Sequence, residues 1–173
     1  ALKSAIQENT KLIFCESIGN PGLEVSDLPK ISKIAHQNSL PLIVDATFST
    51  PILCKPFDHG VDVVVHSVTK WMGGHGVAVG GVIVDGGAFD WGSSKKHPVL
   101  TTPYEPFHGI NFWEEFGPSA LSMKIRAESM RDFGPAMSPH SAFLLLQGIE
   151  TLSLRMNQHV KNAVKLSKWL LEQ

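Results

Sequence analysis

The sequence predicts an α/β fold built on a mostly parallel sheet with helices on both faces. Three short apolar runs of strand length occur at residues 11–16, 41–45 and 61–65. Between the first two, the apolar residues of 26–39 recur at three- and four-residue steps, the spacing of an amphipathic helix. Strand, helix and strand in this order describe a right-handed βαβ unit with parallel strands.

The other elements of the first half follow in chain order. Residues 1–9 are expected to form the end of a helix, and turn-forming residues at 19–22 follow the first strand. Ser26 is expected to cap the next helix, with Pro29 in its first turn. A loop rich in Pro and Thr leads to the third strand, and a second apolar run at 77–84 supplies a fourth.

The second half divides into a segment without periodicity and a helical end. Over residues 91–116, Ser, Lys, Thr and Pro alternate with aromatic residues, which predicts a long loop of functional or interfacial use. Residues 119–132 are expected to be helical. Ser138 begins a last helical region whose apolar face lacks a partner near its end.

Composition excludes several classes of protein. Of the 173 residues, 43% are hydrophobic, and the net charge of −1 argues against a nucleic-acid binder. No apolar run approaches the roughly 20 residues that span a bilayer, so no membrane partner is expected. Cys15 and Cys54 are expected to be reduced thiols of a cytoplasmic protein. No metal site is expected, because His66 and His75 lack a third ligand.

Both ends of the sequence lie inside predicted helices. Residues 1–6 begin in one without an initiator Met or cap, and residues 168–173 stop inside another. The chain is therefore expected to be a piece of a longer protein.

Two charged residues follow strands of the predicted sheet. Lys70 comes shortly after the third strand, where burial would disfavour its charge, as in lysines that attack carbonyl groups. Asp45 ends the second strand, so both residues lie at carboxyl ends of strands, where α/β sheets bind ligands. Alone, each could be an ordinary surface lysine or strand-end aspartate. Together they favour a ligand site.

Three segments carry a resemblance to a known family. Residues 16–21, 44–48 and 66–76 are similar to segments of the pyridoxal-phosphate (PLP) enzymes of Cys/Met metabolism, and the likeness covers nearly the whole chain. It implies an aspartate-aminotransferase-like fold. Residues 1–134 would form the central part of the large PLP-binding domain, and 135–173 a helical connection toward a missing C-terminal domain.

The resemblance also implies roles for individual residues. Lys70 would be the Schiff-base lysine, and Asp45 would hold the pyridine nitrogen. Thr47 would pack on a face of the ring, and Ser67 and Thr69 would bind the phosphate.

Other family features are altered or lie outside the sequence. Asn20 would lie on the side of the phenolic oxygen, whereas Ala46 replaces the usual asparagine. The family's glycine-rich phosphate loop and the aromatic residue that stacks on the ring would precede Ala1. The arginine for the substrate carboxylate would follow Gln173.

The segments 89–91, 133–139 and 145–152 most resemble the O-acetylhomoserine sulfhydrylase branch. This implies γ-replacement on O-acetylhomoserine with sulfide or a thiol, giving homocysteine (or methionine) and acetate, in methionine biosynthesis. It also implies a cytoplasmic homotetramer arranged as a dimer of dimers. The alternatives are a cystathionine γ-synthase or γ-lyase of the same family, or a non-catalytic α/β nucleotide-binding module. The module would leave Asp45, Ser67, Thr69 and Lys70 unexplained.

Overall fold

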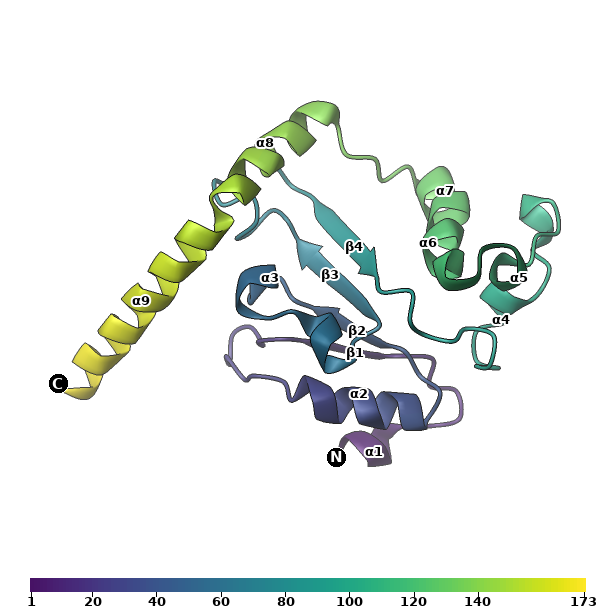
Figure 1. The fold of residues 1–173 in the computed structure, drawn as a ribbon, viewed down its shortest axis with the longest axis horizontal. Coiled ribbons are helices and arrows are strands. Elements are labelled where there is room, and N and C mark those ends of the chain that lie inside the picture. The colour runs from purple at the N-terminus through teal and green to yellow at the C-terminus, as the bar shows by residue number, and fades with distance from the viewer.

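The computed structural model describes residues 1–173 and contains one four-stranded sheet in the order β1-β2-β3-β4 (Figure 1). The strands are β1 (Ile13–Glu16), β2 (Leu42–Asp45), β3 (Val63–Ser67) and β4 (Gly81–Asp85). The first three are parallel, which confirms the predicted sheet, and β4 runs antiparallel to β3. The fourth strand is shorter than the apolar run at 77–84, whose first residues lie in the connection from β3.

Helix α2 (Leu28–Gln37) is the crossover between β1 and β2 and covers one face of the sheet. Nine buried residues form the core of this layer: Ile13, Leu28, Ala35, Leu40, Leu42, Val44, Ala46, Val61 and Val64. The opposite face of β1 is open within this chain, since Phe14 is 57% exposed.

The prediction that Ser26 caps α2 is wrong. Asp27 is the N-cap residue, and its carboxylate accepts a hydrogen bond from Lys30 N at 3.2 Å. Ser26 instead donates its hydroxyl to Glu16 O at 2.7 Å, which ties the start of the crossover to the end of β1. Three shorter helices complete this half: α1 (Leu2–Ala5), α3 (Thr50–Leu53) and the 3₁₀ turn η1 (Pro56–His59).

The prediction of a loop over 91–116 is also wrong, because this segment folds around its own core. It contains α4 (Pro98–Thr101), η2 (Glu105–Phe107) and α5 (Phe112–Phe116), which lie beside the sheet in Figure 1. Five buried residues form the second core: Phe89, Trp91, Leu100, Phe112 and Ala120. Its aromatic rings pack at short range, with the centroids of Phe89 and Trp91 4.7 Å apart.

We expect Phe112→Ala to lower the free energy of unfolding by about 3–5 kcal/mol, because the ring is 0% exposed and its removal leaves a cavity. Urea unfolding followed by tryptophan fluorescence measures this, since Trp91 lies in the same core. Phe133→Ala is the control: that ring is 86% exposed and its loss should cost less than about 0.5 kcal/mol. Equal effects of the two variants would show that the second core does not stabilise the fold.

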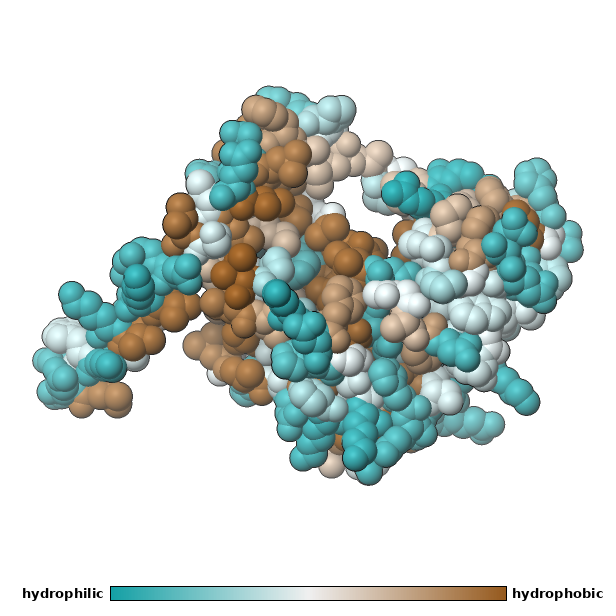
Figure 2. Space-filling view, in the orientation of Figure 1, coloured by the Kyte–Doolittle hydropathy of each residue, from teal (hydrophilic) through white to brown (hydrophobic).

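The last part of the chain is helical, as predicted. The elements are η3 (Gly117–Ser119), α6 (Ala120–Lys124), the π-helical segment η4 (Ile125–Met130), α7 (Arg131–Phe133), α8 (Pro139–Glu150) and α9 (Leu152–Leu171). Ser138 caps α8 by accepting from Ser141 N at 3.1 Å. Helix α9 extends away from the sheet with apolar side chains in the open (Figures 1 and 2), among them Val160, Val164, Leu166 and Trp169.

Two further observations bear on the class of protein. None of the helices combines the length and the apolar character that crossing a membrane requires. Cys15 and Cys54 are free and partly buried, and burial raises the pKa of both thiols.

Candidate active site

The predicted site residues follow the carboxyl ends of three neighbouring parallel strands. Glu16, the last residue of β1, is paired in register with Asp45, the last residue of β2. Ser67 ends β3, and Lys70 lies three residues further along the chain. Parallel strands bring these ends to one edge of the sheet, so segments far apart in sequence meet there.

Hydrogen bonds from Thr47 join two of these strand ends. The backbone N–H of Thr47 donates to Asp45 Oδ1 at 2.8 Å, which leaves Oδ2 for another donor. The Thr47 hydroxyl oxygen accepts from Ser67 N at 2.7 Å. Three of the six predicted residues therefore form one connected group, in which the carboxylate and both hydroxyls are partly buried.

Thr69, the other predicted phosphate ligand, is hydrogen-bonded to Gly80, a partner that the sequence did not indicate. Its hydroxyl donates to Gly80 O at 3.2 Å and accepts from Gly80 N at 2.9 Å, which closes the connection between β3 and β4. The hydroxyl has a single proton, so binding a phosphate oxygen would require it to leave Gly80 O.

Lys70 is positioned through its backbone, and its side chain is exposed. Its N–H donates to Ser67 O at 3.2 Å, and its carbonyl accepts from Gly74 N at 2.8 Å. The expectation that Lys70 is buried is therefore wrong for this chain: the strand before it is buried, but the turn that carries the lysine is open.

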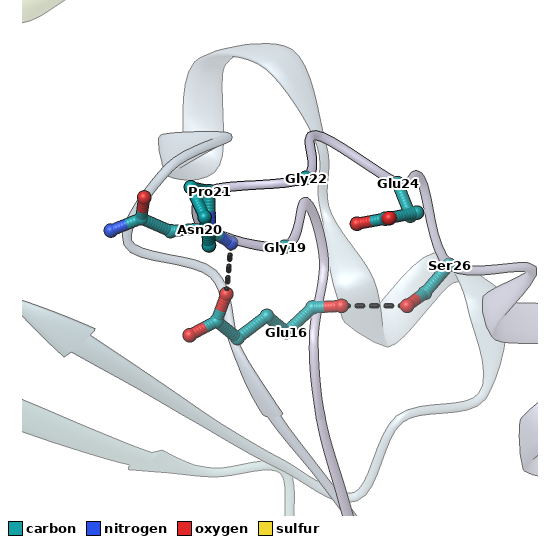
Figure 3. Close-up of a pocket in the computed structure, with 7 residues that line it drawn as sticks. All are labelled: Glu16, Gly19, Asn20, Pro21, Gly22, Glu24 and Ser26. Carbon is teal, nitrogen blue, oxygen red and sulfur yellow. Dashed lines mark hydrogen bonds between the residues drawn. The ribbon is translucent and has the colours of Figure 1, made fainter.

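Asn20 lies in a separate pocket on the loop after β1. Glu16, Gly19, Pro21, Gly22, Glu24 and Ser26 line this pocket with it. Asn20 N donates to Glu16 Oε2 at 2.9 Å, and Figure 3 shows the Asn20 side chain directed away from Glu24 and Ser26. Because Glu16 is paired with Asp45, this loop borders the same edge of the sheet.

A larger cavity of about 970 Å³ lies between the β3–β4 pair and the segment from Ser122 to Met137, which is helical as far as Phe133. Asp45 and Ser67 line it, together with Arg126 of η4. Lys70 and Thr69 do not line it. The cavity therefore borders the Asp45–Thr47–Ser67 group but not the turn that carries Lys70.

His66 is a buried neighbour of this group that sequence reasoning considered only as a metal ligand. It is 7% exposed, and its Nδ1 has no hydrogen-bond partner. Burial lowers the pKa of His66, although the charge of Asp45 and a hydrogen bond with the Ala46 backbone act in the opposite direction. The sequence feature that could have indicated the burial of His66 is its position directly after a run of valines and before Ser67.

Comparison with known proteins places these residues in context. The chain is 50% identical over 171 residues to a homocysteine synthase of Schizosaccharomyces pombe, covering 98% of the chain and 40% of that protein. It is 43% identical over 176 residues to an O-acetyl-L-homoserine sulfhydrylase of Leptospira meyeri, covering 97% of the chain and 40% of that protein. The chain thus spans about two-fifths of the length of these curated relatives.

Solved structures give the same result. A Campylobacter jejuni protein described as an O-acetylhomoserine (thiol)-lyase, which contains N′-pyridoxyl-lysine-5′-monophosphate, matches with a TM-score of 0.93. The two are 36% identical, and the match covers 99% of this chain and 43% of that one. A cystathionine gamma-lyase from Lactobacillus plantarum matches with a TM-score of 0.75 and 33% identity, covering 98% of this chain and 36% of that one.

A family model described as Cys/Met metabolism PLP-dependent enzyme matches residues 1–173, the full length of the sequence. The strand-end aspartate, the hydroxyl residues and the lysine turn all lie within the match. The chain belongs to the family of Cys/Met metabolism PLP-dependent enzymes.

Proposed function

We propose that the protein carrying this chain is a PLP-dependent transferase that replaces the γ-acetoxy group of O-acetylhomoserine with sulfide or a thiol. With hydrogen sulfide, the Cγ–O bond breaks and a Cγ–S bond forms, giving homocysteine and acetic acid. With methanethiol the product would be methionine. The observation that carries this proposal is the hydrogen-bonded group Asp45–Thr47–Ser67 at the strand ends just before Lys70.

The chemistry of these donors fits PLP. Lys70 offers an exposed amine for the aldehyde, and Asp45 keeps one carboxylate oxygen available for the protonated pyridine nitrogen. When bound, PLP supplies an electron sink, because its protonated ring withdraws electrons from the substrate carbon beside the amine. Thr47 holds the Asp45 carboxylate in place through its N–H, so that its charge is fixed before substrate arrives.

Ser67 and Thr69 would hold the phosphate. Ser67 makes its hydrogen bonds at this edge through its backbone N–H and carbonyl, which leaves its hydroxyl to donate to an anion. The Thr69 proton would exchange the 3.2 Å bond to Gly80 O for a shorter bond to a charged oxygen, while Gly80 N continues to donate to the Thr69 hydroxyl.

Lys70 would also move protons during the reaction. Its Nζ would accept the proton of the substrate Cα and would return protons to the carbon chain as acetate leaves and sulfide adds. Exposure of the side chain suits this role, since Nζ has no partner within the chain that it must first leave.

We expect the double variant Ser67→Ala/Thr69→Ala to lose PLP on dialysis on the order of 10²-fold faster than the parent, because each hydroxyl bond to phosphate contributes about 1.5–3 kcal/mol. The measurement is cofactor absorbance retained against time. Thr101→Ala/Thr102→Ala is the matched control, since those hydroxyls donate only to the backbone oxygens of His97 and Pro98. Equal retention by all three proteins would place the phosphate elsewhere.

The nearest alternatives are a cystathionine γ-synthase and a γ-lyase. Product analysis of the purified protein with O-acetylhomoserine separates them: sulfide as acceptor should give homocysteine and acetate. Preference for cysteine as acceptor, or release of an oxo acid, would assign one of the alternatives. A colourless protein that captures no added PLP would leave only a non-catalytic binding module.

Assembly and location belong to the same proposal. We place residues 1–134 in the PLP-binding domain and 135–173 in a helical connection to a further domain. A cytoplasmic dimer of dimers is consistent with the free cysteines and with the apolar side chains that α9 exposes. Light scattering on the protein as it elutes from a size-exclusion column measures its mass. The mass of a monomer would contradict this assembly.

A further inference from the structure

The turn that carries Lys70 is bonded to the junction between α8 and α9 through one side chain, Arg155. Its Nη1 donates to Trp71 O at 2.8 Å, and its Nη2 donates to Met72 O at 3.3 Å and to Gly148 O at 2.6 Å. Its Nε donates to Thr151 Oγ1 at 3.1 Å. All three guanidinium nitrogens are used, and the two carbonyls of the turn directly follow Lys70.

The glycines around this contact allow the backbones to approach closely. A Cβ on Gly148 would lie 2.1 Å from Gly73 O, so α8 touches the backbone of the turn there. A Cβ on Gly74 would lie 2.6 Å from the Arg155 Cζ, and the φ of Gly74 is +73°. The three glycines within residues 73–76, which the cofactor roles do not explain, thus include the residues that admit Arg155 and α8.

Hydrogen bonds within the turn connect this contact to the lysine. Gly74 N donates to Lys70 O at 2.8 Å, and Gly73 N donates to Val68 O at 2.8 Å. On the other side, Lys70 N donates to Ser67 O at the end of β3. The backbone of Lys70 is therefore held between the strand end and the part of the turn that Arg155 binds.

Arg155 does more than satisfy the carbonyls at the end of α8. A guanidinium beside the last turn of a helix is favourable for the helix alone, and the bond to Gly148 O is of that kind. The bonds to Trp71 O and Met72 O contribute nothing to α8, and they join elements more than 80 positions apart in sequence. Their effect is to fix the turn.

We propose that Arg155 is a positioning residue for Lys70: its guanidinium holds the turn after the lysine against the α8–α9 junction and so sets where Nζ meets the cofactor aldehyde. This deepens the proposed function and rests on it, since Lys70 must be the cofactor lysine. The planar fork is essential, because one guanidinium bonds to three carbonyls at once and a lysine ammonium on a flexible stem cannot reproduce the arrangement.

The test uses the natural protein that carries this chain, as holoenzyme and after removal of PLP. Arg155→Met keeps a stem of similar length and removes every donor. We expect it to slow capture of added PLP by Lys70, trapped with borohydride, by about tenfold or more. We also expect the pH midpoint of the visible PLP band to shift by about half a unit or more, because Nζ lies in a changed environment. Arg155→Lys should shift both in the same direction.

Ser94→Ala is the control for a purely structural loss. Ser94 is 1% exposed, and its hydroxyl donates to Ser39 O at 2.9 Å and lies 3.1 Å from His97 Nδ1, so neither partner belongs to the lysine turn. It should lower the melting temperature while leaving the capture rate and the pH midpoint at their wild-type values.

The outcomes separate the two proposals. If Arg155→Met loses stability as Ser94→Ala does but keeps the wild-type capture rate and midpoint, the positioning role is wrong. If Arg155→Met does not fold, Arg155→Lys decides, and wild-type values of both readouts in that variant overturn the proposal. Trapping of PLP at the wild-type rate in Lys70→Ala would instead refute the proposed function itself.

Discussion

Lys70→Ala is expected to abolish the visible absorbance of protein-bound PLP and to lower kcat by about 10³-fold or more. The lysine supplies both the amine that holds the cofactor aldehyde and the base that moves protons at the substrate carbon, and alanine supplies neither. Absorbance spectra and rates of homocysteine formation measure the two losses separately. The variant should fold normally, since the Lys70 side chain is exposed and only the Lys70 backbone makes hydrogen bonds.

The control is Lys161→Ala, which removes an exposed lysine of α9. It should leave both the spectrum and the rate unchanged. An unchanged spectrum in Lys70→Ala would show that the cofactor is bound through another amine.

Asp45→Asn is expected to retain PLP but to lower kcat on the order of 10²-fold or more. The amide keeps an oxygen to accept the hydrogen bond from Thr47 N, so the local structure should persist. It removes the negative charge that keeps the pyridine nitrogen protonated, and a preorganised charge of this kind contributes several kcal/mol to the transition state. Steady-state kinetics of the PLP-saturated variant give the value.

Asp58→Asn serves as the matched control, because Asp58 is exposed on η1. A rate for Asp45→Asn within twofold of wild type would mean that another group protonates the ring.

Local sequence patterns predicted the strand ends and the parallel strands β1 to β3, but neither the direction of β4 nor the long-range contacts. The apolar runs correctly predicted that Asp45 ends a strand and that the lysine turn follows one. The antiparallel direction of β4 could not be read from its composition, since an apolar run looks the same in either direction. The core around Phe112 was missed because its aromatic residues pack across short helices without a regular period.

The contacts that organise the site are likewise non-local. Thr69 is bonded to Gly80 and Arg155 to Trp71, and neither pair leaves a signal at short sequence separation. The burial expected for Lys70 depended on what covers the turn, which the preceding strand does not determine. Gly74 was the sequence feature that indicated the Arg155 contact, because a Cβ at that position would lie 2.6 Å from the Arg155 Cζ.

The most direct test of the central claim is to reduce the holoenzyme with borohydride, digest it and locate the pyridoxyl group by mass spectrometry. If Lys70 binds the cofactor aldehyde, the group is found on the peptide that contains Lys70 and on no other. A pyridoxyl group on a different lysine, or none on a protein saturated with PLP, would contradict it.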